Sequence, residues 1–149
     1  MRAVCMSRWN LNRVMKTFLS IALLTLAGAV AADPVQEAMQ DYAEFAPYDA
    51  GIILPAQVTQ DIFDDVVFID TRSAEEFGAA TIPNAVNIEW REIFGRLDEV
   101  PSDQKVILFC NTGALSAQAA FGVRVLGREN VLVLQTGYHG WLENAAYKP

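Results

Sequence analysis

The chain has 149 residues, which suits a single domain, and its 52% apolar and 19% charged residues are typical of a globular protein. This composition excludes an intrinsically disordered chain. The formal net charge is −7, and residues 32–149 hold all 18 acidic residues but only 7 of the 11 basic ones. A surface of this charge repels nucleic acid and anionic lipid, so we expect neither as a partner.

Residues 1–31 have the three parts of a secretory signal peptide. Arg13 and Lys16 precede the uncharged run Phe18–Val30, and small residues then offer a cleavage site near Ala31. The run has 13 residues, whereas a membrane-spanning helix needs about 20. The pattern therefore favours a cleaved signal over an uncleaved anchor. It predicts a periplasmic protein without membrane attachment after cleavage.

The cysteine count depends on this N-terminal segment. The sequence MKTFLS from Met15 resembles a conventional start of a signal peptide, which indicates that Met15 is the true start. A start at Met15 leaves Cys5 outside the chain, and with a start at Met1 cleavage removes it, so Cys110 is the one cysteine of the mature chain. Because exported proteins usually pair their cysteines, a single thiol is either buried and inert or reactive.

We expect residues 32–48 to form a helical N-terminal extension and residues 49–149 to form the domain that follows it. Pro34 suits the first turn of a helix over 33–46, where apolar residues recur at helical spacing. Pro47 ends this helix because the residue before a proline is disfavoured in a helix.

The rest of the chain alternates between short apolar strands and helices. Strands are predicted over 51–54, 66–70, 85–88, 105–110 and 131–134. Helical segments are predicted from Pro55 and over 73–78, 90–97, 113–126 and 138–147. Short uncharged strands separated by helices indicate a parallel sheet that is covered on both faces. We therefore expect a three-layer α/β fold, with a mostly parallel central sheet and helices on both faces.

Cys110 ends the strand predicted over 105–110 (KVILFC), and a helix is predicted from Gly113 onward. Ligands of parallel sheets bind beyond the carboxyl ends of the strands. Backbone N–H groups and the dipole at a helix N-terminus stabilise a thiolate and lower its pKa. Gly113 allows a backbone turn that side chains would block. A reactive thiol is thus favoured over a buried structural cysteine, the alternative for this residue type.

Three segments of the chain form a set of motifs in a fixed order. They are IDTRSAEEFGAATIPNAVNI (69–88), VILFCNTGALSAQAA (106–120) and LQTGYHGWLENAAY (134–147). Together they resemble the rhodanese-like sulfurtransferase family, which has Asp-x-Arg after a strand, Ile-Pro-Gly-Ala, a Cys-x-x-Gly loop and a Gly-Gly-x-x-x-Trp ending. The resemblance spans residues 50–147, and a lone domain with an export signal is similar to the periplasmic phage-shock rhodaneses.

The resemblance implies a sulfurtransferase or sulfane-sulfur carrier. The Cys110 thiolate would take the outer sulfur of thiosulfate or a persulfide donor, hold it as a persulfide, and pass it to a thiol or to cyanide. Arg72 and the loop would bind the substrate, the loop residues being Asn111, Thr112, Gly113, Ala114, Leu115 and Ser116. The family implies no metal and no organic cofactor.

The chain departs from the family pattern at several positions. No Arg or Lys lies between Cys110 and Ser116, where active members carry one, and Thr81 stands in place of a histidine. Asn84 and Thr136 each replace a glycine of the pattern. The uncharged loop favours a donor less charged than thiosulfate, such as a persulfide or polysulfide.

Two arginines have alternative roles. Arg72 either supplies a cation at Cys110 or forms a salt bridge with Asp70 or a nearby glutamate. Arg91, beside Trp90, either lines the entrance to the site or lies on a solvated helix face.

Three residues of the last helix are also open to interpretation. His139 is expected as an exposed residue at the helix start rather than a base, because persulfide transfer needs no strong base. Tyr138 either shields the site or packs at its rim, and Trp141 is expected in the core.

Two other functions compete with sulfur transfer. A phosphatase or arsenate reductase on a related fold uses Cys-x5-Arg, in which the arginine clamps an oxyanion, but position 116 here is Ser. A catalytically silent rhodanese-like module that binds a partner is favoured by the uncharged loop. Retention of Cys110 favours the enzyme.

Overall fold

The computed structural model describes residues 33–46 and 51–149, and residues 34–149 form one compact unit. The signal peptide predicted over 1–31 lies outside the described residues, as does the end of the predicted extension. None of the helices in the described ranges is both long enough and apolar enough to cross a membrane.

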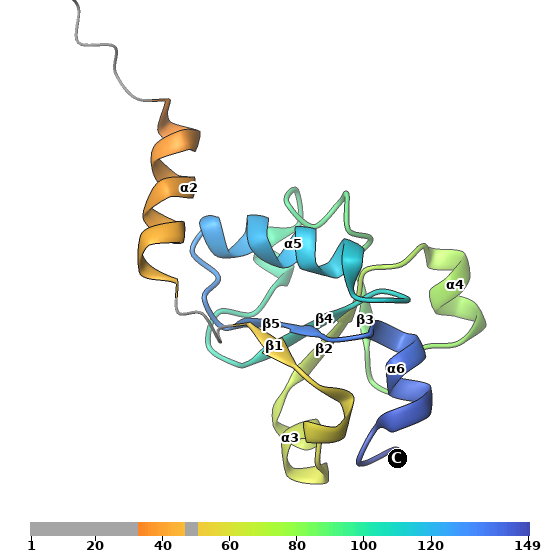
Figure 1. Ribbon diagram of the computed structural model, residues 1–149. Coiled ribbons are helices and arrows are strands. Elements are labelled where there is room, and N and C mark those ends of the chain that lie inside the picture. Colours follow the sequence, from red (N-terminus) through yellow and green to blue (C-terminus); the bar gives the residue numbers. More distant parts are fainter. Residues whose placement is uncertain (1–32, 47–50) are drawn as a thin grey trace, which may run out of the picture. The chain divides into compact units, whose positions relative to one another are not determined.

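A five-stranded sheet forms the centre of the unit (Figure 1). Its strands are β1 (Ile52–Ile53), β2 (Val67–Asp70), β3 (Val86–Asn87), β4 (Val106–Phe109) and β5 (Val131–Leu134). The strand order is β1-β5-β4-β2-β3, and every pair is parallel. The predicted α/β fold with a parallel central sheet is confirmed; β5 has the predicted bounds, and the other four strands are shorter than predicted.

Hydrophobic side chains alternate between the two faces of the sheet, as the pleat of a strand requires. In β4, Leu108 belongs to the core beneath α5 (Ala114–Val125), whereas Ile107 and Phe109 belong to the core on the opposite face. That second core also holds Trp141, which is 3% exposed, as predicted. Burial on both faces explains why the strands are almost entirely apolar.

The helices complete the three layers. Figure 1 shows α5 along one face of the sheet and α3 (Gln60–Asp65) and α6 (Gly137–Asn144) on the other. The remaining helical elements are α2 (Pro34–Phe45), η1 (Pro55–Gln57), α4 (Ala74–Ala79) and η2 (Leu97–Glu99). The turn predicted from Pro55 is η1, and α3, which buries Phe63, is a separate short helix that was not predicted.

The helix predicted over 90–97 is wrong: the chain forms successive turns there, followed by the 3-10 helix η2. Within these turns, backbone amides donate to carbonyls three residues earlier, as the amide of Gly95 does to Glu92. At their start, the amide of Trp90 is instead bonded to the carbonyl of Thr71, 3.0 Å away. This bond ties the start of the segment to the loop after β2.

The register places Cys110 at the functional edge of the sheet. Phe109 of β4 pairs with Asp70 of β2, so the residues that follow both strands emerge side by side. The amide and the hydroxyl of Thr71 both donate to the carbonyl of Phe109, at 2.8 and 3.0 Å. These bonds fix the ends of two neighbouring strands together, immediately before Cys110.

Candidate active site

Cys110 directly follows β4, and its loop leads into α5. Its side chain is 3% exposed, yet its sulfur has polar neighbours. The amide of Gly113 donates to Sγ at 3.2 Å, and the hydroxyl of Ser116 lies 3.7 Å from Sγ. Gly113 has φ +94°, a left-handed backbone that glycine adopts without strain, so the turn brings its amide onto the sulfur.

The pKa of the Cys110 thiol is the result of opposing effects. Burial is the largest single influence and raises the pKa, because the thiolate loses hydration. The amides of Ser116, Thr112 and Leu115, with the Ser116 hydroxyl, lower it by donating to the sulfur. The donors together outweigh burial, so the pKa lies below that of an ordinary thiol. Such a thiol is nucleophilic nearer to neutral pH.

The N-terminus of α6 orients the loop. The amide of Tyr138 donates to the Cys110 carbonyl at 2.7 Å, and the amide of His139 donates to the Asn111 carbonyl at 3.1 Å. In a trans peptide the N–H points opposite to the C=O. The amides of Asn111 and Thr112 therefore point away from α6, which makes Thr112 available to the sulfur. His139 acts here through its main chain, and its side chain is exposed.

Arg72 forms the buried salt bridge that was one of its two predicted roles. Its Nη2 lies 2.6 Å from Oδ2 of Asp70 and its Nε lies 2.9 Å from Oδ1, and both residues are buried. Thr81 donates to the same carboxylate at 2.8 Å, from the position where the family has a histidine. The hydrogen bonds that Arg72 donates to Asp70 are the main reason why the pKa of Arg72 is raised.

Arg72 also reaches the loop, through Asn111. Its Nη1 donates to Oδ1 of Asn111 at 3.3 Å, and Nδ2 of Asn111 donates to Glu76 at 2.7 Å. The guanidinium carbon of Arg72 lies 4.4 Å from the centre of the Tyr138 ring. Tyr138 is half-buried and packs beside the loop, against the guanidinium of Arg72. Arg72 contributes to the site by holding the side chain of Asn111.

A cavity of about 420 Å³ opens beside the sulfur. It brings together Arg72, Cys110, Asn111, Thr112 and Leu115 of the predicted site residues; its other lining residues are Thr71, Ser73, Glu76, Glu89, Trp90 and Arg91. The remaining predicted residues are not in the lining. Gly113 donates its amide to the sulfur, Ser116 lies buried behind it, and Ala114 begins α5 with an exposed side chain.

Six lining residues have no place in the predicted substrate site: Thr71, Ser73, Glu76, Glu89, Trp90 and Arg91. The sequence indicated an entrance role for Arg91 only as an alternative. The signal that could have placed this segment is Asn87, whose Nδ2 donates to the carbonyls of Asp70 and Arg72, at 2.9 and 3.0 Å. These bonds tie the end of β3 to the loop after β2, so the following residues reach the cavity.

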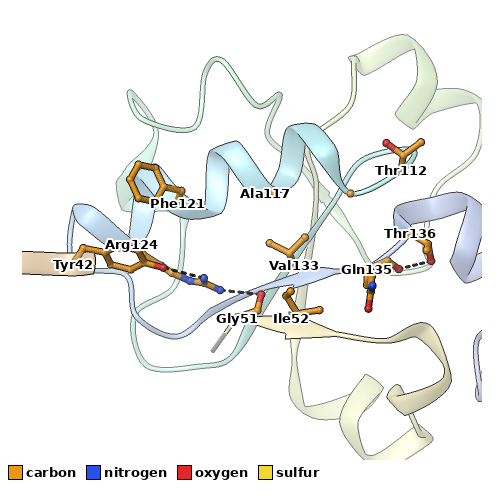
Figure 2. Close-up of a pocket in the computed structure, with 11 residues that line it drawn as sticks. Tyr42, Gly51, Ile52, Thr112, Ala117, Phe121, Arg124, Val133, Gln135 and Thr136 are labelled. Atoms are coloured by element: carbon orange, nitrogen blue, oxygen red, sulfur yellow. Dashed lines mark hydrogen bonds between the residues drawn. The ribbon is translucent and has the colours of Figure 1, made fainter. Parts of the chain in front are cut away.

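A second cavity, of about 340 Å³, shares Thr112 with the first. Figure 2 shows Thr112 at one end and Tyr42 and Arg124 at the other. The Arg124 guanidinium donates to the carbonyls of Gly51 and Val131 and to the Tyr42 hydroxyl, so its role is structural. Cys110 does not line this cavity, which leaves the first as the candidate active site.

Within the described part of the chain, no group of three or more His, Cys, Asp or Glu side chains is arranged to hold a metal ion. The polar atoms of the candidate site instead bond one another, as in the chain from Asp70 through Arg72 and Asn111 to Glu76.

The family model for the rhodanese-like domain matches residues 54–144, which include the Asp70–Arg72 loop, the cysteine loop and α6. The chain belongs to the rhodanese-like domain family. The resemblance stated from the sequence is thus confirmed, whereas similarity to the phage-shock type stays a prediction.

Relatives and solved structures agree with this family. The chain is 33% identical over 78 residues to a sulfurtransferase of Allochromatium vinosum, covering 52% of this chain and 73% of that protein. It is 32% identical over 88 residues to human thiosulfate:glutathione sulfurtransferase, covering 50% and 76% respectively. A rhodanese-related structure from Thermoplasma volcanium has a TM-score of 0.58 and 25% identity, over 62% of this chain and 91% of that one. At family level, these likenesses support a sulfurtransferase-type enzyme.

Two residues of this chain stand where the rhodanese-like pattern has glycine, and both have a left-handed backbone. Asn84 has φ 65° and Thr136 has φ 63°. Asparagine tolerates this conformation, whereas a β-branched threonine is strained in it. The Thr136 side chain occupies space that Gly140 leaves open, since a Cβ on Gly140 would lie 1.7 Å from Oγ1 of Thr136.

Proposed function

We propose that this rhodanese-like protein transfers sulfane sulfur through a persulfide on Cys110. The observation that carries the proposal is the set of loop amides around Sγ, beside an open cavity. Those amides lower the pKa of the thiol, which supplies the nucleophile, and we expect them to stabilise the negative charge of a second sulfur bound to it.

In the first step, the Cys110 thiolate attacks the outer sulfur of the donor. A new S–S bond forms to Cys110, and the bond between the outer sulfur and the rest of the donor breaks, with its electron pair leaving on that group. With thiosulfate the leaving group is sulfite, and with an organic persulfide it is a thiolate. The outer sulfur remains as a persulfide anion on Cys110. Its charge takes the place of the thiolate charge, so the same N–H donors stabilise it.

In the second step, an acceptor thiolate attacks the outer sulfur of this persulfide. The Cys110–S bond breaks, its electron pair returns to Cys110 as the thiolate, and the acceptor leaves as a persulfide. Cyanide in the same role leaves as thiocyanate. Atoms and charge balance without an oxidant, a reductant or a metal ion, and two easier displacements replace one direct transfer.

The loop without Arg or Lys favours organic persulfides as donors over thiosulfate. A dianion in a partly desolvated cavity requires a cation close by. Arg72 is already neutralised by Asp70, and Glu76 adds negative charge to the lining. Arg91, the other arginine of the lining, is paired with Glu89. A donor with less charge on the transferred unit needs less compensation.

The experiment is intact mass spectrometry of residues 32–149 after incubation with thiosulfate or with glutathione persulfide. The expected result is a cyanide-sensitive gain of one sulfur, about 32 Da, on the wild type, larger with the persulfide. The Cys110→Ser variant should gain nothing. No adduct on the wild type with either donor would overturn the proposal and support a silent partner-binding module, the alternative that the nearly buried sulfur and the uncharged loop favour.

We also propose that the protein is exported and acts in the periplasm, as the signal-like pattern of residues 1–31 indicates. Expression of the full chain in a Gram-negative host tests this. The periplasmic fraction should contain a protein whose mass corresponds to an N-terminus near Ala32. A full-length product confined to the cytosolic fraction would contradict export.

A further inference from the structure

Two guanidinium groups line the Cys110 cavity, and they differ in how their N–H donors are used. Arg72 is 6% exposed, and its Nε and Nη2 donate to Asp70. Its Nη2 also donates to the carbonyl of Ala80, at 2.7 Å, and its Nη1 donates to Asn111. The donors of Arg72 are therefore engaged within the protein, which leaves little of its charge for a ligand.

Arg91 is the opposite case. Its side chain is 71% exposed, and its Nε donates to the carboxylate of Glu89, at 2.9 and 3.2 Å from the two oxygens. Among the residues that the structure describes, Nη1 and Nη2 of Arg91 have no hydrogen-bond partner. The two terminal nitrogens of a guanidinium can together bind an anionic group in a bidentate manner.

The backbone under Arg91 is fixed although its side chain is exposed. The amide of Trp90 is bonded to Thr71, next to Arg72, and Ile93 on the other side is fully buried. The amide of Arg91 donates to Glu89 at 3.1 Å. Since the segment forms turns rather than the predicted helix, it follows the rim of the cavity, and Arg91 lines that cavity together with Cys110.

Apolar groups stand beside this cation. The Trp90 ring centre lies 6.0 Å from the guanidinium carbon of Arg91, and Leu115 contributes an aliphatic side chain from the cysteine loop. Trp90 and Leu115 both line the cavity, so a ligand there meets apolar surface as well as a cation.

We propose that Arg91 binds the anionic group of the sulfur donor, while Trp90 and Leu115 contact its carbon body. The ligand class is an anionic organic sulfur compound, such as the persulfide of a carboxylated thiol or a thiosulfonate. This inference rests on the proposed function for the identity of the ligand, but the recognition of an anion beside the Cys110 thiol is a separate property.

The first experiment measures anion recognition without any sulfur transfer. Cys110 is alkylated with iodoacetate, an anion, and with iodoacetamide, its neutral analogue of similar size, and the ratio of the two rates is compared between variants. For Arg91→Gln we expect this ratio to fall about three- to tenfold at low salt, and the change to shrink in about 1 M salt, where the Debye length is near 3 Å. Glu89→Gln should raise the ratio.

Arg96→Gln is the matched control, because it removes the same charge from a partly exposed arginine that is not in the cavity lining. Its ratio should equal that of the wild type. An unchanged ratio in Arg91→Gln, or an equal fall in Arg96→Gln, overturns the inference. Because iodoacetamide reports the nucleophilicity of the thiol, an equal change with both reagents in Arg91→Gln would also overturn it, by showing an effect on the sulfur alone.

The second experiment uses donor kinetics with a neutral acceptor, 2-mercaptoethanol. Thiosulfate carries two negative charges, whereas methanethiosulfonate has a methyl group in place of one anionic oxygen and carries one. In Arg91→Gln, kcat/KM should fall more for thiosulfate than for methanethiosulfonate, with kcat/KM for the acceptor unchanged. Equal losses for both donors contradict the inference. If the wild type transfers no sulfur from any donor while its alkylation ratio still depends on Arg91, the proposed function fails and anion recognition stands.

Discussion

Gly137 lies so close to Cys110 that a Cβ on Gly137 would be 2.2 Å from the Cys110 carbonyl oxygen. Its φ of +59° is also a left-handed conformation, which non-glycine residues adopt at a cost. This approach lets the first amides of α6 bond the carbonyls of Cys110 and Asn111, and so turn the loop amides toward the sulfur. Gly137 thus links the last helix of the fold to the chemistry of the thiol.

Gly137→Ala should therefore harm both stability and reactivity. We expect the free energy of unfolding to fall by about 2–4 kcal/mol, because the backbone is strained and the loop is displaced. Iodoacetamide should alkylate Cys110 more slowly at neutral pH than in the wild type, because the amides no longer converge on the sulfur. Urea unfolding and alkylation kinetics measure the two effects.

Gly78→Ala is the control for that substitution. Gly78 lies in α4, and a Cβ there meets nothing within 4 Å. We expect it to stabilise the protein by up to about 1 kcal/mol, through helix propensity, with no change in alkylation. Equal effects of the two substitutions would show that the approach of Gly137 to the loop is unimportant.

The thiol of Cys110 should make stability depend on pH. Its folded-state pKa is lowered, so the thiolate stabilises the folded state above the unfolded-state pKa, and this stabilisation is lost as pH falls through the folded-state pKa. The difference in unfolding free energy between wild type and Cys110→Ala should then be larger near pH 9.5 than near pH 6, around an ordinary thiol pKa of about 8.5. Chemical unfolding with a reductant present, at both pH values, measures it.

Alkylation gives an independent measure of the same shift. The pH at which iodoacetamide reacts at half its maximal rate should be lower for the folded protein than for the urea-unfolded chain. Ser116→Ala removes a hydroxyl that lowers the pKa of the thiol, so it should move this midpoint upward. A midpoint equal to that of the unfolded chain would refute a thiolate stabilised by the loop.

Sequence patterns predicted the sheet well because burial on both faces demands apolar strands, as in VILF of β4. They also placed Cys110 correctly, because the spacing of apolar residues shows where the strand ends and the next helix begins. The turns over 90–96 escaped prediction because Ile93 and Leu97 are spaced as in a helix, while the bond from Trp90 to Thr71 is a long-range contact. The choice between the roles of Arg72 likewise depended on tertiary packing, which brings Asn111 and Ala80 to its guanidinium.

The buried pair of Asp70 and Arg72 should be far more important for stability than the pair of Glu89 and Arg91, in which the arginine is exposed. Asp70 is fully buried and accepts from Arg72 and Thr81, so Asp70→Asn leaves a buried guanidinium without its counter-ion. We expect a loss of about 3–5 kcal/mol. Glu89→Gln, at a solvent-exposed arginine, should cost less than about 1 kcal/mol. Urea unfolding of the two variants compares them, and similar losses would contradict the assigned burial.

Gly51 and Gly127 offer a test of how Arg124 joins α2, α5 and β1. Both glycines have a left-handed backbone, at φ +88° and +90°, so an alanine strains each equally, by about 1–2 kcal/mol. A Cβ on Gly51 would also lie 1.7 Å from Nη2 of Arg124, whereas one on Gly127 meets nothing within 4 Å. Because that guanidinium is held by Gly51, Val131 and Tyr42, it cannot move without losing hydrogen bonds. Thermal unfolding should therefore show a larger loss for Gly51→Ala than for Gly127→Ala, and the difference should vanish when both are made in an Arg124→Ala background. A difference that persists in that background would place the strain at Gly51 in the backbone and not at Arg124.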